Sequence, residues 1–196
     1  MYLSWIIPSK NEERNIEKSI REVNAYLSGR AIEYEIIVVD SHSGDRTREI
    51  VERLMKEIRE LSILEANDAG KGGAVLDGML KAGGAVRLFS DADNSTAPDH
   101  FGKMEPYLQQ GYDLVIGSIE LAGAVIDELL PLVEDKAWFF DSELLIVGEK
   151  SGLKIKEVPV IWHNPPGSKV GLSAYVSTFR ELLIIKWNDL KGTYAR

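Results

Sequence analysis

The chain has 196 residues, of which 44% are hydrophobic and 28% are charged, a balance typical of a folded globular domain. Its formal net charge of -8 argues against a general nucleic-acid binder, because neutralising phosphates requires clustered Lys and Arg and the sequence shows no basic stripe. The sequence has no cysteine, which excludes disulfides, thiolate metal sites and cysteine nucleophiles and fits a reducing compartment.

The apolar run at the start of the chain, residues 1–8, is too short for a signal peptide or a membrane span. We therefore expect a cytoplasmic protein, with at most a peripheral attachment to the inner face of the cell membrane. No internal repeat, low-complexity tract or linker interrupts the sequence, so residues 1–170 are expected to form one domain.

Apolar runs of strand length alternate with helical patterns along most of the chain. Ser9 and Glu12 are predicted to form a capping box that opens the first helix. Strands that alternate with helices at this spacing predict an α/β fold, a mostly parallel sheet with helices on both faces. Residues 1–117 alone would supply a five-stranded parallel core. The predicted strands are residues 3–7, 34–39, 61–65, 85–90 and 112–117, and the predicted helices are approximately residues 9–27, 45–60, 72–82 and 98–109.

Two further elements are predicted near the end of the chain. Residues 154–162 should add an edge strand, because Pro159 cannot donate to a central ladder. Residues 172–190 show a helical pattern with an apolar stripe, within a carboxyl-terminal segment 171–196. This helix either packs on the domain or on a partner subunit of a homo-oligomer, or lies at a membrane surface, where Trp187 and the neighbouring lysines would suit the headgroup boundary.

Polar clusters follow four of the predicted strands, at the carboxyl ends where α/β sheets bind ligands. Turn chemistry explains one such cluster more easily than four that coincide at one edge of a sheet. The clusters are residues 8–12, 40–45, 68–73 and 91–95.

The fourth cluster carries Asp91 and Asp93, directly after an apolar strand. Residues i and i+2 of an extended segment share a face, so the two carboxylates can point the same way. Two hard oxygen ligands at that edge suit a Mg²⁺ or Mn²⁺ ion that also holds phosphates. The alternative is a plain turn rich in Asp, Asn and Ser.

Taken in order, these clusters resemble glycosyltransferase family 2, the inverting enzymes with a nucleotide-binding GT-A fold. The motifs that carry the resemblance are IIPSKNEERNI, EIIVVDSHSGDRT, NDAGKGGAVLDGMLKAGGAVRLFSDADNS and YDLVIGS. A later stretch is similar to the branch that makes dolichyl- or polyprenyl-phosphate mannose or glucose, namely FFDSELLIVGEKSGLKIKEVPVIWHNPPGSKV. The match covers most of residues 3–170 and implies a Rossmann-like GT-A domain.

The resemblance also implies a reaction and its partners. It implies transfer of a sugar from a nucleotide-diphosphate sugar, of the GDP-mannose or UDP-glucose type, to a polyprenyl phosphate, with Mg²⁺ or Mn²⁺ as cofactor. Asp91 and Asp93 would be the catalytic and metal-binding residues. The residues expected to bind the nucleotide are Pro8, Asn11, Glu12, Asp40 and Lys71, and those expected on the acceptor side are Glu143 and Lys169.

Each of these assignments has a structural alternative. Glu12 would also serve as a capping-box carboxylate and Asp40 as a turn former, while Lys71 and Lys169 would also suit solvated loops. Asp141 and Ser142, beside Glu143, would also suit a helix cap.

The chain departs from the family pattern at several positions. Lys10 replaces a frequent aromatic residue, Ser41 replaces the second acid of an Asp pair, and Ile119 stands where polyprenyl-phosphate members often carry Arg. After Ser118 a few dozen residues of the acceptor side are missing. Transfer to a sugar hydroxyl and a non-catalytic nucleotide-sugar-binding module therefore remain as alternative functions.

Overall fold

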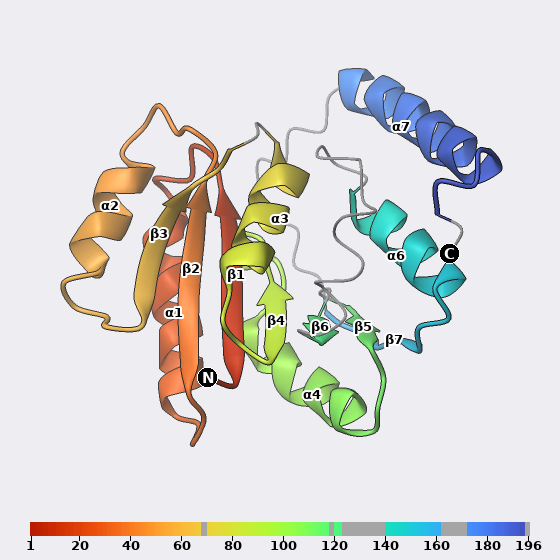
Figure 1. The fold of residues 1–196 in the computed structure, drawn as a ribbon. Helices are drawn as coiled ribbons and strands as arrows, with labels where there is room; N and C mark the ends of the chain where they lie inside the picture. The colour runs from red at the N-terminus through yellow and green to blue at the C-terminus, as the bar shows by residue number, and fades with distance from the viewer. Residues whose placement is uncertain (68–69, 118–119, 123–139, 162–171, 195–196) are drawn as a thin grey trace.

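The computed structural model describes residues 1–67, 70–117, 120–122, 140–161 and 172–194. Its amino-terminal half is built on four parallel strands: β1 (Leu3–Ser9), β2 (Tyr34–Asp40), β3 (Leu61–Glu65) and β4 (Val86–Phe89). β1 is central, pairing with β2 on one side and β4 on the other (Figure 1). All seven residues of β1 are buried, as expected for a parallel strand covered on both faces.

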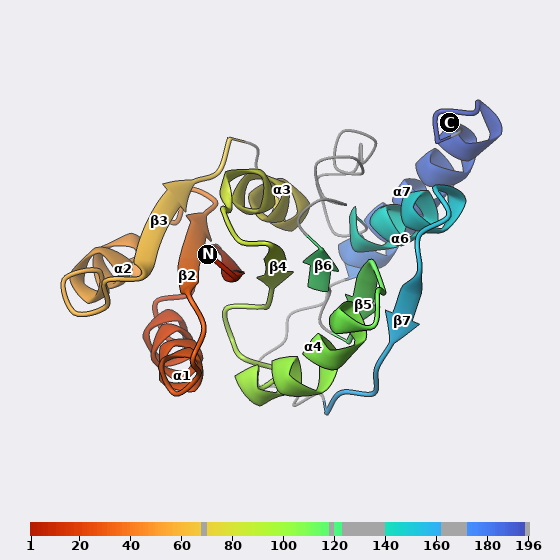
Figure 2. The same ribbon diagram turned by 60° about the horizontal axis from the view of Figure 1, so that its bottom comes forward.

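Helices cover both faces of this sheet. They are α1 (Ile16–Ser28), α2 (Thr47–Leu54), α3 (Lys71–Lys81) and α4 (Phe101–Gln109), the last preceded by a short 3₁₀ turn η1 (Pro98–His100). Side chains at alternate positions of β1 enter two separate cores: Trp5 packs with α1 and α2, and Ile6 packs with α3. Figure 2 shows α1 and α4 on one side of the sheet and α3 on the other. The predicted α/β class with helices on both faces is confirmed.

The carboxyl-terminal half completes a seven-stranded sheet with the order β3-β2-β1-β4-β6-β5-β7. Its strands are only three residues long: β5 (Leu114–Ile116), β6 (Glu120–Ala122) and β7 (Ile155–Glu157). β6 runs antiparallel to both β4 and β5 and separates them. The predicted five-stranded parallel core of residues 1–117 is therefore wrong in one respect, because four strands are contiguous and the fifth is reached only through β6. β7 lies at the sheet edge, as predicted for residues 154–162, but it ends at Glu157, before Pro159.

Two helices follow on the side of the sheet that α3 covers. α6 (Phe140–Lys150) packs into the same core as α3, and α7 (Leu172–Leu190) lies beyond α6 (Figure 1). α7 has the bounds that the sequence predicted, and its Ile185 and the following Tyr194 are buried in that core. Within the described part of the chain, no helix combines the length and the apolar character needed to cross a membrane.

The predicted capping box at the start of the first helix is wrong. Ser9 belongs to β1, and α1 begins only at Ile16. The backbone N–H of Glu12, which the capping box requires, lies outside the helix and donates to Thr47 Oγ1 at 2.8 Å instead. A contact over 35 positions in the sequence thus replaces the local one.

Candidate active site

A cleft of about 400 Å³ lies at the carboxyl ends of β1, β2 and β4, where the sequence predicted a ligand site. Its walls come from the loops that follow these strands and from the first residue of α3. Five residues predicted from the sequence line it: Pro8, Glu12, Lys71, Asp91 and Asp93. The other lining residues are Ser9, Lys10, Ser41, Gly70 and Ala92.

The remaining predicted nucleotide residues, Asn11 and Asp40, do not line the cleft. Asp40 is 2% exposed at the end of β2, and its carboxylate accepts hydrogen bonds from the backbone N–H and the hydroxyl of Ser43. The side-chain carbonyl of Asn11 accepts from the N–H of Gly44 at 2.8 Å. In this structure both side chains shape loops, and Ser41, next to Asp40, lines the cleft in its place.

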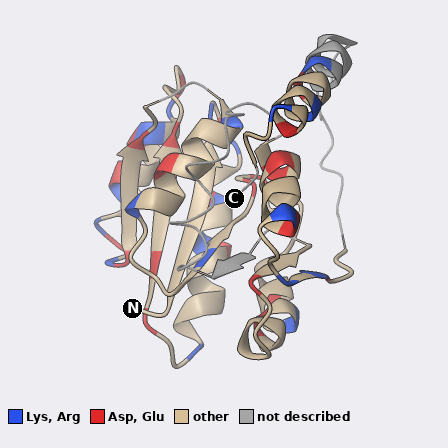
Figure 3. Cartoon of the chain, turned by 45° about the vertical axis from the view of Figure 1, so that its right-hand side comes forward, with Lys and Arg blue, Asp and Glu red and all other residues tan. Residues whose placement is uncertain are grey.

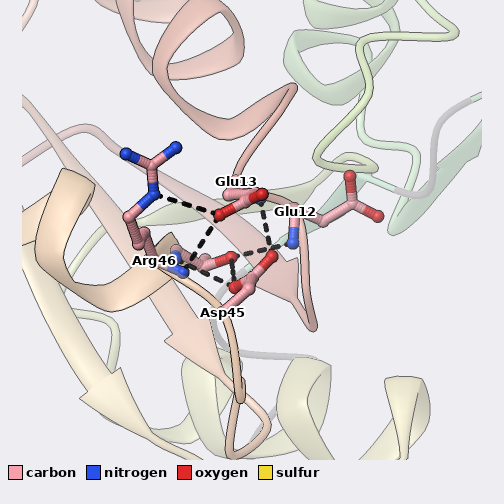
Figure 4. A network of polar contacts seen from close by, with 5 residues as sticks. Glu12, Glu13, Asp45 and Arg46 are labelled. Atoms are coloured by element: carbon pink, nitrogen blue, oxygen red, sulfur yellow. Dashed lines mark hydrogen bonds and ion pairs between the residues drawn. The ribbon is translucent and has the colours of Figure 1, made fainter.

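The loops after β1 and β2 are held together by a polar network around Asp45 (Figure 4). Asp45 accepts from the N–H of Glu13 at 3.1 Å and from the hydroxyl of Thr47 at 2.5 Å, and Arg46 bonds to the Glu13 carboxylate at 3.3 Å. Burial alone would raise the pKa of Asp45, but the hydrogen bonds from Thr47 and Glu13 outweigh it and hold the pKa below its usual 3.8. The carboxylate of Glu12 points away from this network and accepts from Asn15 instead.

Three of these loops carry a residue other than glycine in the left-handed backbone region. Asn11 and His42 have φ of 56° and Asn94 has φ of 51°, in the loops after β1, β2 and β4 respectively. Such conformations persist where surrounding contacts over-determine them, and they gather at functional sites. Asn94 is held by the Ser19 hydroxyl and by Glu22, both on α1. The sequence signal for this geometry was available, since Asn and His tolerate the conformation best after glycine, but it was not used.

The helix α3 presents Lys71 to the cleft from its first turn. Gly70, at φ of 125°, supplies the sharp entry into the helix that a residue with a Cβ rarely adopts. Gly78 lets the helix lie against β1 and β2, since a Cβ there would meet Ile6 Cγ2 at 2.6 Å. Lys71 Nζ lies 2.5 Å from Asp91 Oδ1, so the predicted phosphate-binding lysine and a predicted metal ligand form an ion pair.

Asp93 is held by a turn of its own. Its Oδ1 accepts from the N–H and the hydroxyl of Ser95, at 2.9 and 2.5 Å, which fixes the carboxylate at the cleft wall. Within the described residues, no three carboxylate or imidazole side chains gather as a closed metal site. Two carboxylates fit a Mg²⁺ or Mn²⁺ ion nevertheless, because these ions are commonly held by one or two carboxylates together with substrate phosphates and water.

A second hollow of about 300 Å³ adjoins the first and shares Lys71 and Asp91 with it. Hydroxyl side chains are frequent in its wall, as in a site for a polyhydroxylated or phosphorylated ligand. The residues that line only this hollow are Phe89, Ser90, Ser95, Thr96, Ile116, Gly117, Asp141, Ser142 and Leu145.

Of the two residues predicted on the acceptor side, the structure describes only Glu143. Glu143 is on α6 but turned inward: it is 1% exposed and accepts a hydrogen bond from the hydroxyl of Tyr194. Its neighbours Asp141 and Ser142 line the second hollow, and the Ser142 N–H donates to Asp141 at 2.7 Å. Lys169 lies outside the described residues.

Residues 4–147 match the family model for glycosyl transferase family 2. The dolichyl-phosphate beta-glucosyltransferase ALG5A of Trichomonas vaginalis is 26% identical over 235 residues, covering 94% of this chain and 73% of the relative. That span exceeds the 196 residues of this chain, so the relative carries extra residues within it. The dolichol-phosphate mannosyltransferase of Pyrococcus furiosus is 33% identical over 127 residues, covering 65% of this chain and 36% of the relative.

The fold has solved counterparts. The mannosyltransferase PcManGT of Pyrobaculum calidifontis, in complex with GDP-Man and Mn²⁺, superposes with a TM-score of 0.72 at 17% identity, covering 96% of this chain and 64% of that one. The glucosyl-3-phosphoglycerate synthase of Mycobacterium tuberculosis gives 0.71 at 18% identity, covering 94% and 78%. These are GT-A folds, and the predicted fold is confirmed. With the family model matched over most of the chain, this protein belongs to glycosyltransferase family 2.

Proposed function

We propose that this glycosyltransferase moves a hexose from a nucleoside-diphosphate sugar to a polyprenyl phosphate such as dolichyl phosphate. The observation that carries the proposal is the meeting of Lys71 and Asp91 at the junction of the two hollows, with Asp93 in the wall of the first. A diphosphate needs a cation and hard oxygen ligands at this point, with room for a nucleoside on one side and for sugar and acceptor on the other. Relatives named as dolichyl-phosphate glucosyl- and mannosyltransferases support the choice of acceptor.

The residues of the first hollow would then contact different parts of the donor. Pro8, Glu12 and Ser41 wall the space for the nucleoside, and Lys71 supplies positive charge to the diphosphate. Asp93, and Asp91 once its ion pair opens, would hold Mg²⁺ or Mn²⁺. Bound there, the ion stabilises the negative charge that develops on the departing diphosphate.

A phosphate acceptor suits the second hollow for a chemical reason. A sugar hydroxyl must lose a proton during attack and needs a positioned carboxylate base, whereas a phosphate monoester is largely ionised at neutral pH and needs none. Glu143 cannot serve as that base as it stands, because its carboxylate is buried against Tyr194. Asp141, which lines the hollow, is the observation that favours transfer to a hydroxyl as the second candidate.

The outward face of α7 supports a peripheral contact with the cytoplasmic face of a membrane. Leu183, Trp187 and Leu190 project at helical spacing and are each more than half exposed. Lys186 and Lys191 flank them, the latter 5.2 Å from the centroid of the Trp187 ring, and the acid Asp189 pairs both with Lys150 of α6 and with Lys186 at 3.6 Å. Basic side chains beside an apolar stripe match an anionic lipid surface and oppose the pairing of two identical copies.

Figure 3 shows Lys and Arg interspersed with Asp and Glu along the described helices of this view rather than gathered into one stripe. No basic stripe of the kind that binding a nucleic acid requires is therefore visible on the described helices in this view.

The decisive test follows the sugar into the lipid. The protein is incubated with Mn²⁺, dolichyl phosphate and radiolabelled GDP-mannose or UDP-glucose, and the mixture is extracted into organic solvent. Label in the lipid phase is expected, and Asp93→Asn should abolish it. Label released only to water, or moved to soluble sugars, would refute the lipid acceptor; binding of donor without any release would indicate a binding module.

Two further measurements locate the acceptor contacts. Lys169→Ala should weaken use of dolichyl phosphate more than it weakens binding of the nucleotide. Sedimentation with vesicles that contain phosphatidylserine should capture the wild type and fail to capture Trp187→Ser. Concentration-dependent dimerisation that Trp187→Ser abolishes, without vesicle binding, would assign the α7 face to a second copy instead.

A further inference from the structure

The ion pair between Lys71 and Asp91 sits at the point where the two hollows meet. Lys71 Nζ is 2.5 Å from Asp91 Oδ1, and the two side chains are 27% and 32% exposed. Both residues line both hollows. An ammonium group therefore already occupies one of the two carboxylates that the proposed metal requires.

An ammonium and a divalent cation cannot share this carboxylate oxygen. Mg²⁺ binds carboxylate oxygens at roughly 2.0–2.1 Å, and a Lys nitrogen in direct contact with the same oxygen would repel the ion strongly at that range. With Lys71 in place, Asp91 Oδ1 is closed to a metal and the nearby ammonium weakens binding at the second oxygen of that carboxylate, so most of the site falls to Asp93. Asp93 alone is a weak site, since its Oδ1 already accepts two hydrogen bonds from Ser95.

Lys71 can leave Asp91 without disturbing the fold. It is the first residue of α3, and its side chain is 27% exposed at the cleft, so a change of its partner does not open the buried core. Its Nζ lies 6.0 Å from the Phe89 ring centroid, over an apolar surface along which the flexible four-carbon stem can swing. What would draw it away is a diphosphate at the amino-terminal end of α3, where backbone N–H groups also favour anions.

We propose that Lys71 is an internal counter-ion of Asp91 that is exchanged for a divalent cation when the donor diphosphate binds. The diphosphate takes the ammonium, and Asp91 is released to join Asp93 at the metal. Metal and nucleotide then bind cooperatively, and linkage requires each to raise the affinity of the other by the same factor. The proposal rests on the donor and metal sites proposed above.

The test compares Mn²⁺ binding with and without nucleotide. Free Mn²⁺ is measured by electron paramagnetic resonance during titration into the wild type, alone and with saturating UDP or GDP. For the wild type, weak binding of Mn²⁺ alone and a large gain with the nucleoside diphosphate are expected. In Lys71→Met, Mn²⁺ alone should bind about fivefold more tightly, the factor at the upper end for loss of a partly exposed ion pair, and the gain from UDP should shrink.

A matched control separates the exchange from a general change of charge. Lys10 is exposed and lines the same cleft, so Lys10→Met removes an equal charge without vacating Asp91. It should change the affinity for Mn²⁺ alone by less than twofold, and Lys71→Arg should keep the weak binding of the wild type. Circular dichroism verifies that each variant is folded.

The outcomes are distinguishable. If the wild type does not bind Mn²⁺ even when UDP or GDP is present, the proposed metal site is wrong and the proposed exchange is wrong with it. If the wild type binds Mn²⁺ together with UDP or GDP, but Lys71→Met behaves as Lys10→Met does, the donor site stands and the exchange alone is overturned.

Discussion

The two halves of this molecule hold their parts in place by different means. In the amino-terminal half, β1 is buried over all seven of its residues and β2 over its last five, and the loops that follow them are joined by hydrogen bonds between residues more than 30 positions apart. In the carboxyl-terminal half the strands have three residues each, and α7 leaves large apolar side chains exposed. The proposed donor side is thus preorganised by the chain itself, while the half proposed to bind the acceptor offers exposed apolar surface.

Two tryptophans give the most direct test of this contrast. Trp5 is 3% exposed, packs edge-on against Phe101 and donates to the Ser90 hydroxyl at 2.8 Å. Trp5→Ala should lower the free energy of unfolding by about 3–5 kcal/mol. Trp187 is 59% exposed, so Trp187→Ala should lower the free energy of unfolding by less than about 0.5 kcal/mol.

Denaturant unfolding measures both variants. If Trp5→Ala does not accumulate in folded form, Trp5→Phe serves in its place, with a smaller but still clear loss. Equal losses at Trp5 and Trp187 would show that α7 is packed as firmly as the sheet.

The next largest effect is expected at the metal-binding carboxylate. Asp93→Asn removes a full negative charge where a divalent cation is proposed. The affinity for nucleoside diphosphate in the presence of Mn²⁺ should therefore fall about 100-fold or more in this variant, and by a smaller factor in Asp91→Asn. Calorimetry with and without EDTA measures the loss. Asp99→Asn is the control, because its carboxylate is largely exposed and lines neither hollow. An unchanged affinity for nucleoside diphosphate in Asp93→Asn would contradict the proposed metal site.

A smaller effect is expected where α3 lies on the sheet. The Cβ of Gly78→Ala would come within 2.6 Å of Ile6 and 2.9 Å of Val39, so we expect a loss of about 1–3 kcal/mol as β1 and β2 shift. Gly29→Ala, whose Cβ would find its nearest neighbour at 3.7 Å, is the matched control. Thermal melting compares the two. Equal melting temperatures for Gly78→Ala and Gly29→Ala would mean that α3 packs less tightly on the sheet than the structure shows.

The smallest effect concerns pH and the polar network of the donor loops. The pKa of Asp45 is lowered in the folded state, so its carboxylate stabilises the fold above the unfolded pKa of 3.8, and that contribution disappears as the pH falls through the lower folded value. Asp45→Asn should therefore cost up to about 1 kcal/mol at pH 7. The difference from the wild type should vanish well below pH 3.8. A difference that is independent of pH would assign the loss to packing rather than to charge.

Local pattern was sufficient for most of the elements and for the place of the site. Strands with continuous apolar runs, such as β1 and β2, were predicted to within two residues, and the parallel arrangement put Lys71, Asp91 and Asp93 at one edge before any coordinates. Motif order then gave the family. These successes share a cause, since buried parallel strands and the polar residues at their ends are encoded within a few neighbouring positions.

The errors all came from contacts between distant residues. The predicted capping box is wrong because the Thr47 hydroxyl accepts the hydrogen bond from the N–H of Glu12. The predicted five-stranded parallel core is wrong because β6, only three residues long, pairs with β4 in the place predicted for β5. Glu143 was expected to face the acceptor, but Tyr194, 51 positions later, binds it in the core. No periodicity or short motif records such pairings.

The place of β6 has a consequence for how the chain folds as it leaves the ribosome. When residues 1–117 have emerged, β3, β2, β1 and β4 can pair in that order, and β4 is then an open edge until residues 120–122 arrive to close it. An open edge strand invites pairing with other nascent chains. Arg87 lies in the middle of β4, with its guanidinium bonded to the carbonyl of Met79, and a charge at that position discourages such pairing during the interval. Pairing of the short antiparallel strand β6 with β4 covers this edge in the folded protein.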